Sequence, residues 1–110
     1  MTAVSWHTKD PETGVINVGT YNGTLLGPTR ASCRAAQGHL RIHWDKHHEK
    51  GEPLPAAIVI GAVPAVMMTS VVRIPYGLGE LDVAGGLAGA PIEVVPCETI
   101  DLLVPSTAEV

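Results

Sequence analysis

INVGTYNG, residues 16–23, is the segment from which the fold can be predicted most directly. The surrounding residues 15–26 are rich in Val, Ile, Thr and Tyr, which favour strands. Gly19 and Gly23 interrupt this strand, and glycine inside a strand marks a bulge or a close approach of the backbone to a ligand. Such a strand can hold a phosphate through its N–H groups and polar side chains, or it can be an ordinary bulged strand.

The segments that follow predict further strands, and with the helices below they indicate an α+β fold. Residues 27–29 (GPT) form a turn that folds residues 30–34 back as the second strand of a hairpin. The run LPAAIVIGA, residues 54–62, is continuously apolar, as in a strand buried on both faces. Residues 92–104 predict one or two more strands, with Pro96 at an edge or a bulge.

Three helices are expected, at residues 39–50, 64–72 and 79–87. In the first, apolar and imidazole side chains share one face, and Gly51 ends the helix. Pro64 suits the first turn of the second helix, because proline lacks an N–H group that would be unpaired there.

Composition and charge exclude several classes of protein. The chain has 45% hydrophobic and 16% charged residues, which favours a folded domain over a disordered segment. Its net charge of −4 argues against a general nucleic-acid or anionic-membrane surface. The longest apolar stretch, residues 54–68, is short and broken by Pro and Gly, so no membrane span is expected.

Cys33 and Cys97 are the two cysteines, too few for the disulfide framework of a small secreted domain. We expect two reduced, buried thiols, with a single disulfide between them as the alternative. The first residues contain no apolar core of signal-peptide length. A cytoplasmic protein is therefore the default expectation.

Histidines and one glutamate are candidate metal ligands. His39, His43 and His47 are spaced by four residues, which stacks imidazoles on one helical face. The segment has neither the Glu of a zinc-protease motif nor a Cys partner. The alternative for His43, His47 and His48 is a polar, half-exposed helix, whereas His39 opens the helix. Glu80, at an expected helix start, complements the helix dipole or serves as a rigidly held metal ligand.

Several segments, taken in order, resemble one family. INVGTYNG (16–23), GEPLPAAIVIGAVPA (51–65) and IPYGLGELDVAGGLAGAPIEVVPCETIDLLVPSTAEV (74–110) are similar to the central domain of UbiD-type carboxy-lyases. This family decarboxylates 4-hydroxybenzoate, phenylacrylate and related aryl acids, and residues 77–109 are the most specific part of the match. The resemblance implies that residues 1–110 are a partial UbiD-like domain, a split β-barrel of the flavin-reductase type, without the family's flanking domains.

The resemblance also implies a cofactor, prenylated FMN, held with Mn²⁺ and K⁺. The Mn²⁺ ion bridges the FMN phosphate and three side chains, which fall by position on Asn17, His39 and Glu80. Oxygen donors and one imidazole suit this ion. The remaining residues implied at the cofactor are Val18, Gly19, Thr20, Tyr21 and Asn22 along it, Gly38 at its phosphate, and Ser70, Val71 and Val72 near K⁺.

Family members remove CO₂ from an aromatic or α,β-unsaturated carboxylic acid. They take their cofactor from a flavin prenyltransferase and are expected as homo-oligomers. A glutamate reprotonates the product, and an Arg five residues after the first Asn orients the substrate carboxylate. That catalytic position is Asn22 here, which cannot form the charged fork, and neither Arg30 nor Arg34 has the motif spacing. The family's catalytic Glu pair has no match among Glu93, Glu98 and Glu109.

Three hypotheses follow. In the first, the chain is a fragment of a prenylated-FMN-dependent decarboxylase, since residues 104–110 resemble the start of a further strand. It is then inactive alone, because the catalytic Glu pair has no match in it. In the second, it is a non-catalytic flavin- or phosphate-binding module or a subunit of a carboxylase assembly, because Asn22 replaces the Arg while the metal donors survive. In the third, it is a structural fragment whose core the rest of a larger protein covers.

Overall fold

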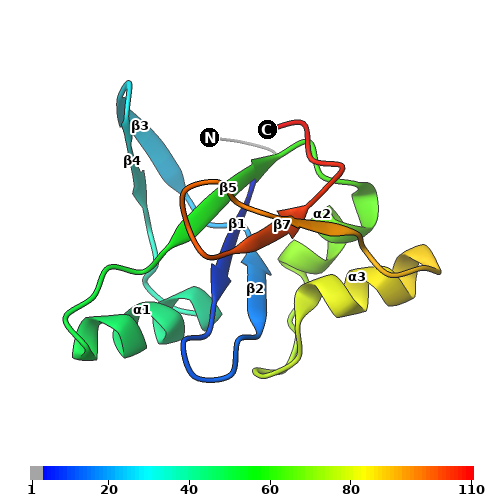
Figure 1. Cartoon of the computed structure of the whole chain (residues 1–110), viewed down its shortest axis with the longest axis horizontal. Coiled ribbons are helices and arrows are strands. Elements are labelled where there is room, and N and C mark those ends of the chain that lie inside the picture. The colour runs from blue at the N-terminus through cyan, green and yellow to red at the C-terminus, as the bar shows by residue number, and fades with distance from the viewer. Residues whose placement is uncertain (1–3) are drawn as a thin grey trace.

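The structure, a computed structural model, describes residues 4–110 and confirms the α+β class (Figure 1). Three helices and seven strands are found in this range. In chain order they are β1 (Val4–Lys9), β2 (Ile16–Gly19), β3 (Gly23–Gly27), β4 (Arg30–Cys33), α1 (His39–Glu49), β5 (Ala56–Ile60), α2 (Pro64–Val71), α3 (Glu80–Ala88), β6 (Val94–Pro96) and β7 (Leu103–Pro105).

The central sheet has the antiparallel order β2-β1-β5. Val4 and Trp6 of β1 pack against Leu40 of α1 on one face of this sheet. Val18 of β2 packs on the other face against α2 and α3, because successive side chains of a strand point to opposite sides. In Figure 1, α1 lies on one side of β1 and β2, and α2 with α3 on the other. The sheet therefore has an apolar core on each face.

The sequence did not predict β1, although it is the strand between the other two. Its residues VSWHTK include four polar side chains, which hide an apolar pattern. Ser5, His7 and Thr8 are nevertheless fully buried, because β1 has a strand on each side and packing on both faces. The expected strand at residues 15–26 is instead two strands, β2 and β3, separated by three residues that belong to neither.

Two hairpins flank the central sheet. β3 and β4 pair with a register shift near Leu25, and this hairpin projects from the body of the molecule (Figure 1). β6 and β7 pair across the sheet, with Pro96 at the end of β6. The described residues thus form three separate antiparallel sheets and no closed barrel, so the expected split barrel stays a prediction.

Several smaller expectations can be compared with residues 4–110. Both cysteines are free, as expected, but they are half-buried rather than buried. Burial raises the pKa of the Cys33 thiol. Residues 106–110 form no strand, although Val110 exchanges two backbone hydrogen bonds of 2.7 and 3.1 Å with Ile60 of β5. No helix in the described range is long and apolar enough to cross a bilayer.

His43 corrects one interpretation. A polar, half-exposed helix was the alternative for His43, His47 and His48, yet His43 is only 2% exposed and its Nδ1 lies 2.9 Å from the Thr8 hydroxyl. His48 is exposed, as that interpretation requires. His43 is buried because it lies one turn after Leu40, on the helix face that packs against β1. Burial lowers its pKa from 6.5 to about 4.

We expect acid to destabilise the protein between pH 6.5 and about 4, because unfolded His43 takes up a proton in this range and folded His43 does not. Each unit of pKa difference corresponds to about 1.4 kcal/mol of unfolding free energy. His43→Gln should flatten this pH dependence, although buried His7 preserves part of it. His48→Gln, on the exposed face of the same helix, is the matched control. Urea unfolding at several pH values measures the slope, and an unchanged slope in His43→Gln would contradict the assignment.

Candidate metal and phosphate site

Asn17, His39 and Glu80 come from three different elements and line one cavity of about 10 Å³. Asn17 lies in β2, His39 is the first residue of α1 and Glu80 is the first residue of α3. His39 Nδ1 is 3.5 Å from Glu80 Oε1. The space is ion-sized, since a single water needs a similar volume. The three side chains predicted to bind a metal therefore do converge.

The outer edge of β2 holds this arrangement in place. The N–H of Val18 donates a hydrogen bond of 3.1 Å to Glu80 Oε2, and the N–H of Thr20 donates one of 3.3 Å to the Ser70 carbonyl. These bonds join α3 and the end of α2 to a strand edge that would otherwise be open. The side chain of Val18 points into the apolar core, so only its main chain belongs to the site.

Glu80 is a nearly buried carboxylate, with 4% of its surface exposed. Burial raises its pKa, although its own N–H, that of Val18 and His39 oppose this effect. A divalent cation beside it would remove the cost of burying a negative charge. Within residues 4–110 no three His, Cys, Asp or Glu side chains gather into a metal site, and the third donor here is the Asn17 amide. Carbonyl oxygen, carboxylate and imidazole together fit an ion such as Mn²⁺.

The N-terminus of α1 lies beside these donors and is shaped for an anion. Gly38 precedes the helix with φ of 88°, a conformation that favours glycine, and no side chain of its own caps the helix. The Leu40 N–H and the Asn17 amide each donate to the Tyr21 hydroxyl at 3.4 Å. A Cβ at Gly19 would lie 2.5 Å from the Tyr21 ring. N–H groups at a helix start favour phosphate binding, which fits the predicted cofactor.

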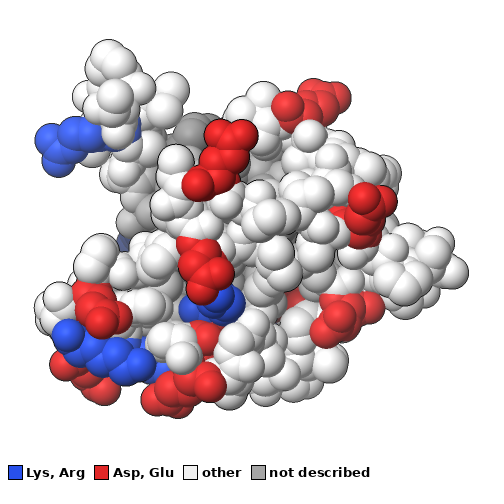
Figure 2. Space-filling view, viewed as in Figure 1, with Lys and Arg blue, Asp and Glu red and all other residues white. Residues whose placement is uncertain are grey.

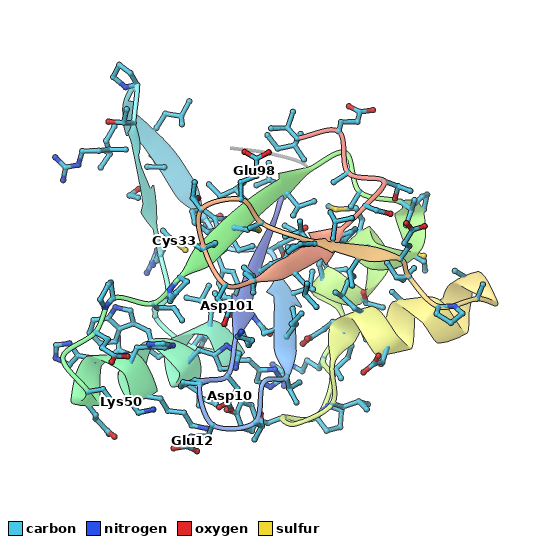
Figure 3. The ribbon with its side chains drawn as sticks, in the orientation of Figure 1. Asp10, Glu12, Cys33, Lys50, Glu98 and Asp101 are labelled. Carbon is cyan, nitrogen blue, oxygen red and sulfur yellow. The ribbon has the colours of Figure 1, made fainter. Side chains whose placement is uncertain are left out.

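A cluster around the buried Asp10 carboxylate, which the sequence did not predict, supports the site. Asp10, 1% exposed, accepts hydrogen bonds from the Tyr76 hydroxyl and from Lys46 Nζ, the latter at 2.8 Å. Tyr76 packs edge-on against His39 with ring centroids 5.2 Å apart. This cluster fixes the loop that leads into Glu80 against the β1–β2 turn and α1, near the Asp10 label in Figure 3.

The ionisation of this cluster is set by its hydrogen bonds. Burial alone would raise the pKa of Asp10, but Lys46, Tyr76 and two backbone N–H groups hold it well below its usual range. The hydrogen bond to Asp10 in turn raises the pKa of the Lys46 ammonium. Asp10 and Lys46 therefore stay a charged pair across the range in which proteins are usually studied.

Other residues predicted at the cofactor do not line this cavity. Ser70 is buried, and its carbonyl is bonded to Thr20, which places the end of α2 beside the strand motif. Val71 and Val72 follow and are 68% and 59% exposed. Asn22 lies at the base of the β3–β4 hairpin. His39 and Glu80 are thus 3.5 Å apart, whereas residues 22 and 70–72 are not part of the cavity lining.

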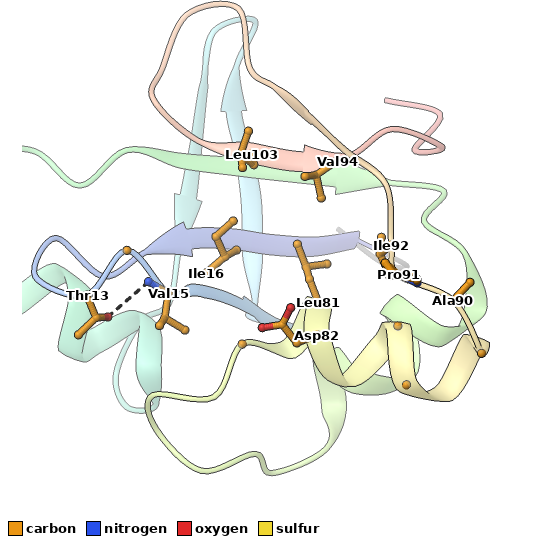
Figure 4. A pocket seen from close by; sticks show the side chains of 15 residues that line it. Thr13, Val15, Ile16, Leu81, Asp82, Ala90, Pro91, Ile92, Val94 and Leu103 are labelled. Atoms are coloured by element: carbon orange, nitrogen blue, oxygen red, sulfur yellow. Dashed lines mark hydrogen bonds between the residues drawn. The ribbon is translucent and has the colours of Figure 1, made fainter.

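A larger groove of about 830 Å³ lies on the other side of β2 (Figure 4). The β1–β2 turn, α3 and the β6–β7 hairpin enclose it, and its labelled side chains are mostly apolar. The sequence did not predict this groove, because its lining comes from segments far apart in the chain. The visible face in Figure 2 shows acidic and basic residues intermixed, without a continuous basic surface.

The family model for UbiD, 3-octaprenyl-4-hydroxybenzoate carboxy-lyase Rift-related domain, matches residues 1–110. The chain belongs to the UbiD family, and the resemblance found in its sequence is confirmed. Anhydromevalonate phosphate decarboxylase of Methanothermobacter thermautotrophicus is 35% identical over 97 residues, which are 88% of this chain and 23% of that protein. Phenolic acid decarboxylase of Streptomyces sp. is 34% identical over 106 residues, 93% of this chain and 22% of the relative.

Solved structures agree with this assignment. The UbiD-class enzyme HmfF from Pelotomaculum thermopropionicum, in complex with FMN, matches 99% of this chain and 24% of its own with a TM-score of 0.93 and 37% identity. An evolved dimeric form of HmfF, in complex with prenylated FMN (prFMN), matches 98% of this chain and 25% of its own with a TM-score of 0.92 and 36% identity. The chain spans about a quarter of the length of the relatives it matches.

We expect Tyr76→Phe to lower the free energy of unfolding by about 1–3 kcal/mol, because it leaves buried Asp10 without one donor. Tyr21→Phe is a matched control, since its hydroxyl makes only two hydrogen bonds of 3.4 Å. Urea unfolding of both variants measures the difference. A larger loss in Tyr21→Phe than in Tyr76→Phe would show that the Asp10 cluster does not hold the loop.

Proposed function

We propose that this chain is the cofactor-phosphate and metal-binding part of a prenylated-FMN-dependent decarboxylase. Its substrate would be an aromatic or α,β-unsaturated carboxylic acid, and the reaction a non-oxidative loss or gain of CO₂. The observation that carries the proposal is the convergence of Asn17, His39 and Glu80 on one ion-sized cavity beside the start of α1. Family membership and the FMN-containing and prenylated-FMN-containing relatives support it.

In this proposal each part of the site has its own role. Asn17, His39 and Glu80 hold Mn²⁺, which neutralises the cofactor phosphate at Gly38 and the first turn of α1. Residues 18–22 lie along the cofactor, and residues 70–72 offer groups to K⁺. The bound cofactor supplies the electron-accepting chemistry that decarboxylation needs, while the protein positions it and excludes water.

The proposed reaction needs groups that residues 4–110 do not gather at the site. Glu93 and Glu98 are exposed and lie outside the cavity formed by the metal donors. We therefore assign proton transfer to the full-length enzyme. In the same proposal, that enzyme forms a homo-oligomer and completes a flavin-reductase-type split barrel. A flavin prenyltransferase supplies its cofactor. A relative described as a dimeric form supports the oligomer.

A second candidate function is a non-catalytic module that binds a flavin or its phosphate within a carboxylase assembly. Asn22, a neutral residue at the position where the family resemblance implies an Arg, favours it. Both candidates require the metal and phosphate site, and they differ in whether CO₂ is released.

Metal-dependent flavin binding tests the site common to both candidates. The complete gene product should bind FMN more tightly with Mn²⁺ than with a chelator, measured by quenching of flavin fluorescence. Glu80→Gln should lower the Mn²⁺-dependent affinity at least about tenfold, because it removes the buried anionic ligand. Glu98→Gln, which changes an exposed carboxylate, should leave it unchanged. Equal Mn²⁺-dependent affinity for FMN in wild type and Glu80→Gln would contradict the proposed metal site.

Release of CO₂ distinguishes the two candidates. The complete gene product, loaded with prenylated FMN and Mn²⁺, should release CO₂ from cinnamate or 4-hydroxybenzoate if it is a decarboxylase. Flavin binding without release from a panel of such acids would favour the non-catalytic module instead.

A further inference from the structure

A cation favours recognition of a carboxylic acid, because a guanidinium or ammonium group forms stronger hydrogen bonds to a carboxylate than a neutral amide does. Three of the seven Lys and Arg side chains in residues 4–110 already have an anionic partner, among them Arg41 with Asp45. Lys9 is paired with Asp101 at 2.9 Å, and Lys46 is paired with Asp10. Those without such a pair are Arg30, Arg34, Lys50 and Arg73.

Position separates these four cations. Lys50 lies at the far end of α1, as its label in Figure 3 shows, and Arg30 begins β4 next to the tip of the projecting hairpin. Arg73 follows α2 on an exposed segment. Arg34 lies at the base of the hairpin, where the chain leaves β4 and turns towards α1.

The hairpin register places Arg34 directly across from Asn22. Gly23 pairs with Cys33. Asn22 and Arg34 are the next pair further from the hairpin tip, and the Arg34 N–H donates a hydrogen bond of 2.8 Å to the Asn22 carbonyl. Side chains of directly opposed residues in an antiparallel pair lie on the same face, with Cβ atoms about 4.5–5.5 Å apart. The Arg34 side chain can therefore reach the same region that a side chain at position 22 would occupy.

We propose that Arg34 is the substrate-binding cation of this protein, supplied from the opposite strand to Asn22. The inference rests on the proposed function, since it names the group that would bind the carboxylate of the aromatic or unsaturated acid. Arg34 is exposed, so its guanidinium is free to approach a ligand, and the Asn22 amide beside it can add a neutral hydrogen bond. The spacing of residues in the sequence did not predict this role, because the residue that pairs with position 22 depends on the hairpin register.

The test measures binding of cinnamate and of its neutral amide, cinnamamide, to the complete gene product loaded with FMN and Mn²⁺, by calorimetry. Arg34→Asn should weaken cinnamate binding about 10- to 100-fold and change cinnamamide binding by less than about threefold. The exchange variant Asn22→Arg/Arg34→Asn has the same composition as the wild type and should recover cinnamate binding to within about threefold. Recovery by exchange is a result that a merely structural role of Arg34 does not produce.

Matched variants complete the design. Arg30→Asn removes the same charge from the same strand, about 13 Å away at the usual rise per residue, and should leave cinnamate binding unchanged. Arg34→Lys keeps the charge without the planar fork and should give an intermediate affinity. Wild-type cinnamate binding in Arg34→Asn, no recovery in the exchange variant, or a larger loss in Arg73→Asn would each overturn the proposal.

Failure of this inference can be told apart from failure of the proposed function. If the wild type shows Mn²⁺-dependent FMN binding and binds cinnamate, but Arg34→Asn binds it equally well, only the role of Arg34 is wrong. If the wild type shows no Mn²⁺-dependent FMN binding, the proposed site itself is wrong, and the role of Arg34 is rejected with it.

Discussion

The arrangement of the site depends on one hydrogen bond, from the Val18 N–H on the outer edge of β2 to the carboxylate of Glu80. This bond pairs the Val18 N–H, which the sheet leaves without a partner. It also offsets part of the cost of burying the Glu80 carboxylate. Because Val18 also packs its side chain against α2 and α3, the same residue secures both the core and the carboxylate. Asn17, the neighbouring residue, then points to the opposite face, towards α1 and His39.

Much of the fold was predictable because the relevant signals are local. Turn residues, Pro64 at a helix start and a continuous apolar run at residues 54–62 located all three helices and most of the strands. β1 was missed because its burial comes from the strands on both sides, a non-local property that its polar residues conceal. His43 was misjudged for a similar reason, since its burial comes from β1, which the sequence did not predict, packing against that face of α1.

The residues of the candidate site likewise differ in whether a local sequence signal could predict them. Asn17, His39 and Glu80 could be assigned only through the family resemblance, because three donors separated by 22 and 41 residues have no spacing signal of their own. The cluster of Asp10, Lys46 and Tyr76 had no such guide: its members are 36 and 66 residues from Asp10, and each has an ordinary local interpretation. The pairing of Arg34 with position 22 likewise required the register of a hairpin.

The projecting β3–β4 hairpin has a consequence for motion. Leu25 and Leu26 near its tip are 71% and 61% exposed, whereas Cys33 at its base packs against the core of Val4, Trp6 and Leu40. Amide hydrogens near the tip should therefore exchange with solvent through local opening, and those at the base only through rarer, larger fluctuations. Residues 22 and 34 therefore lie at the better protected end of this hairpin.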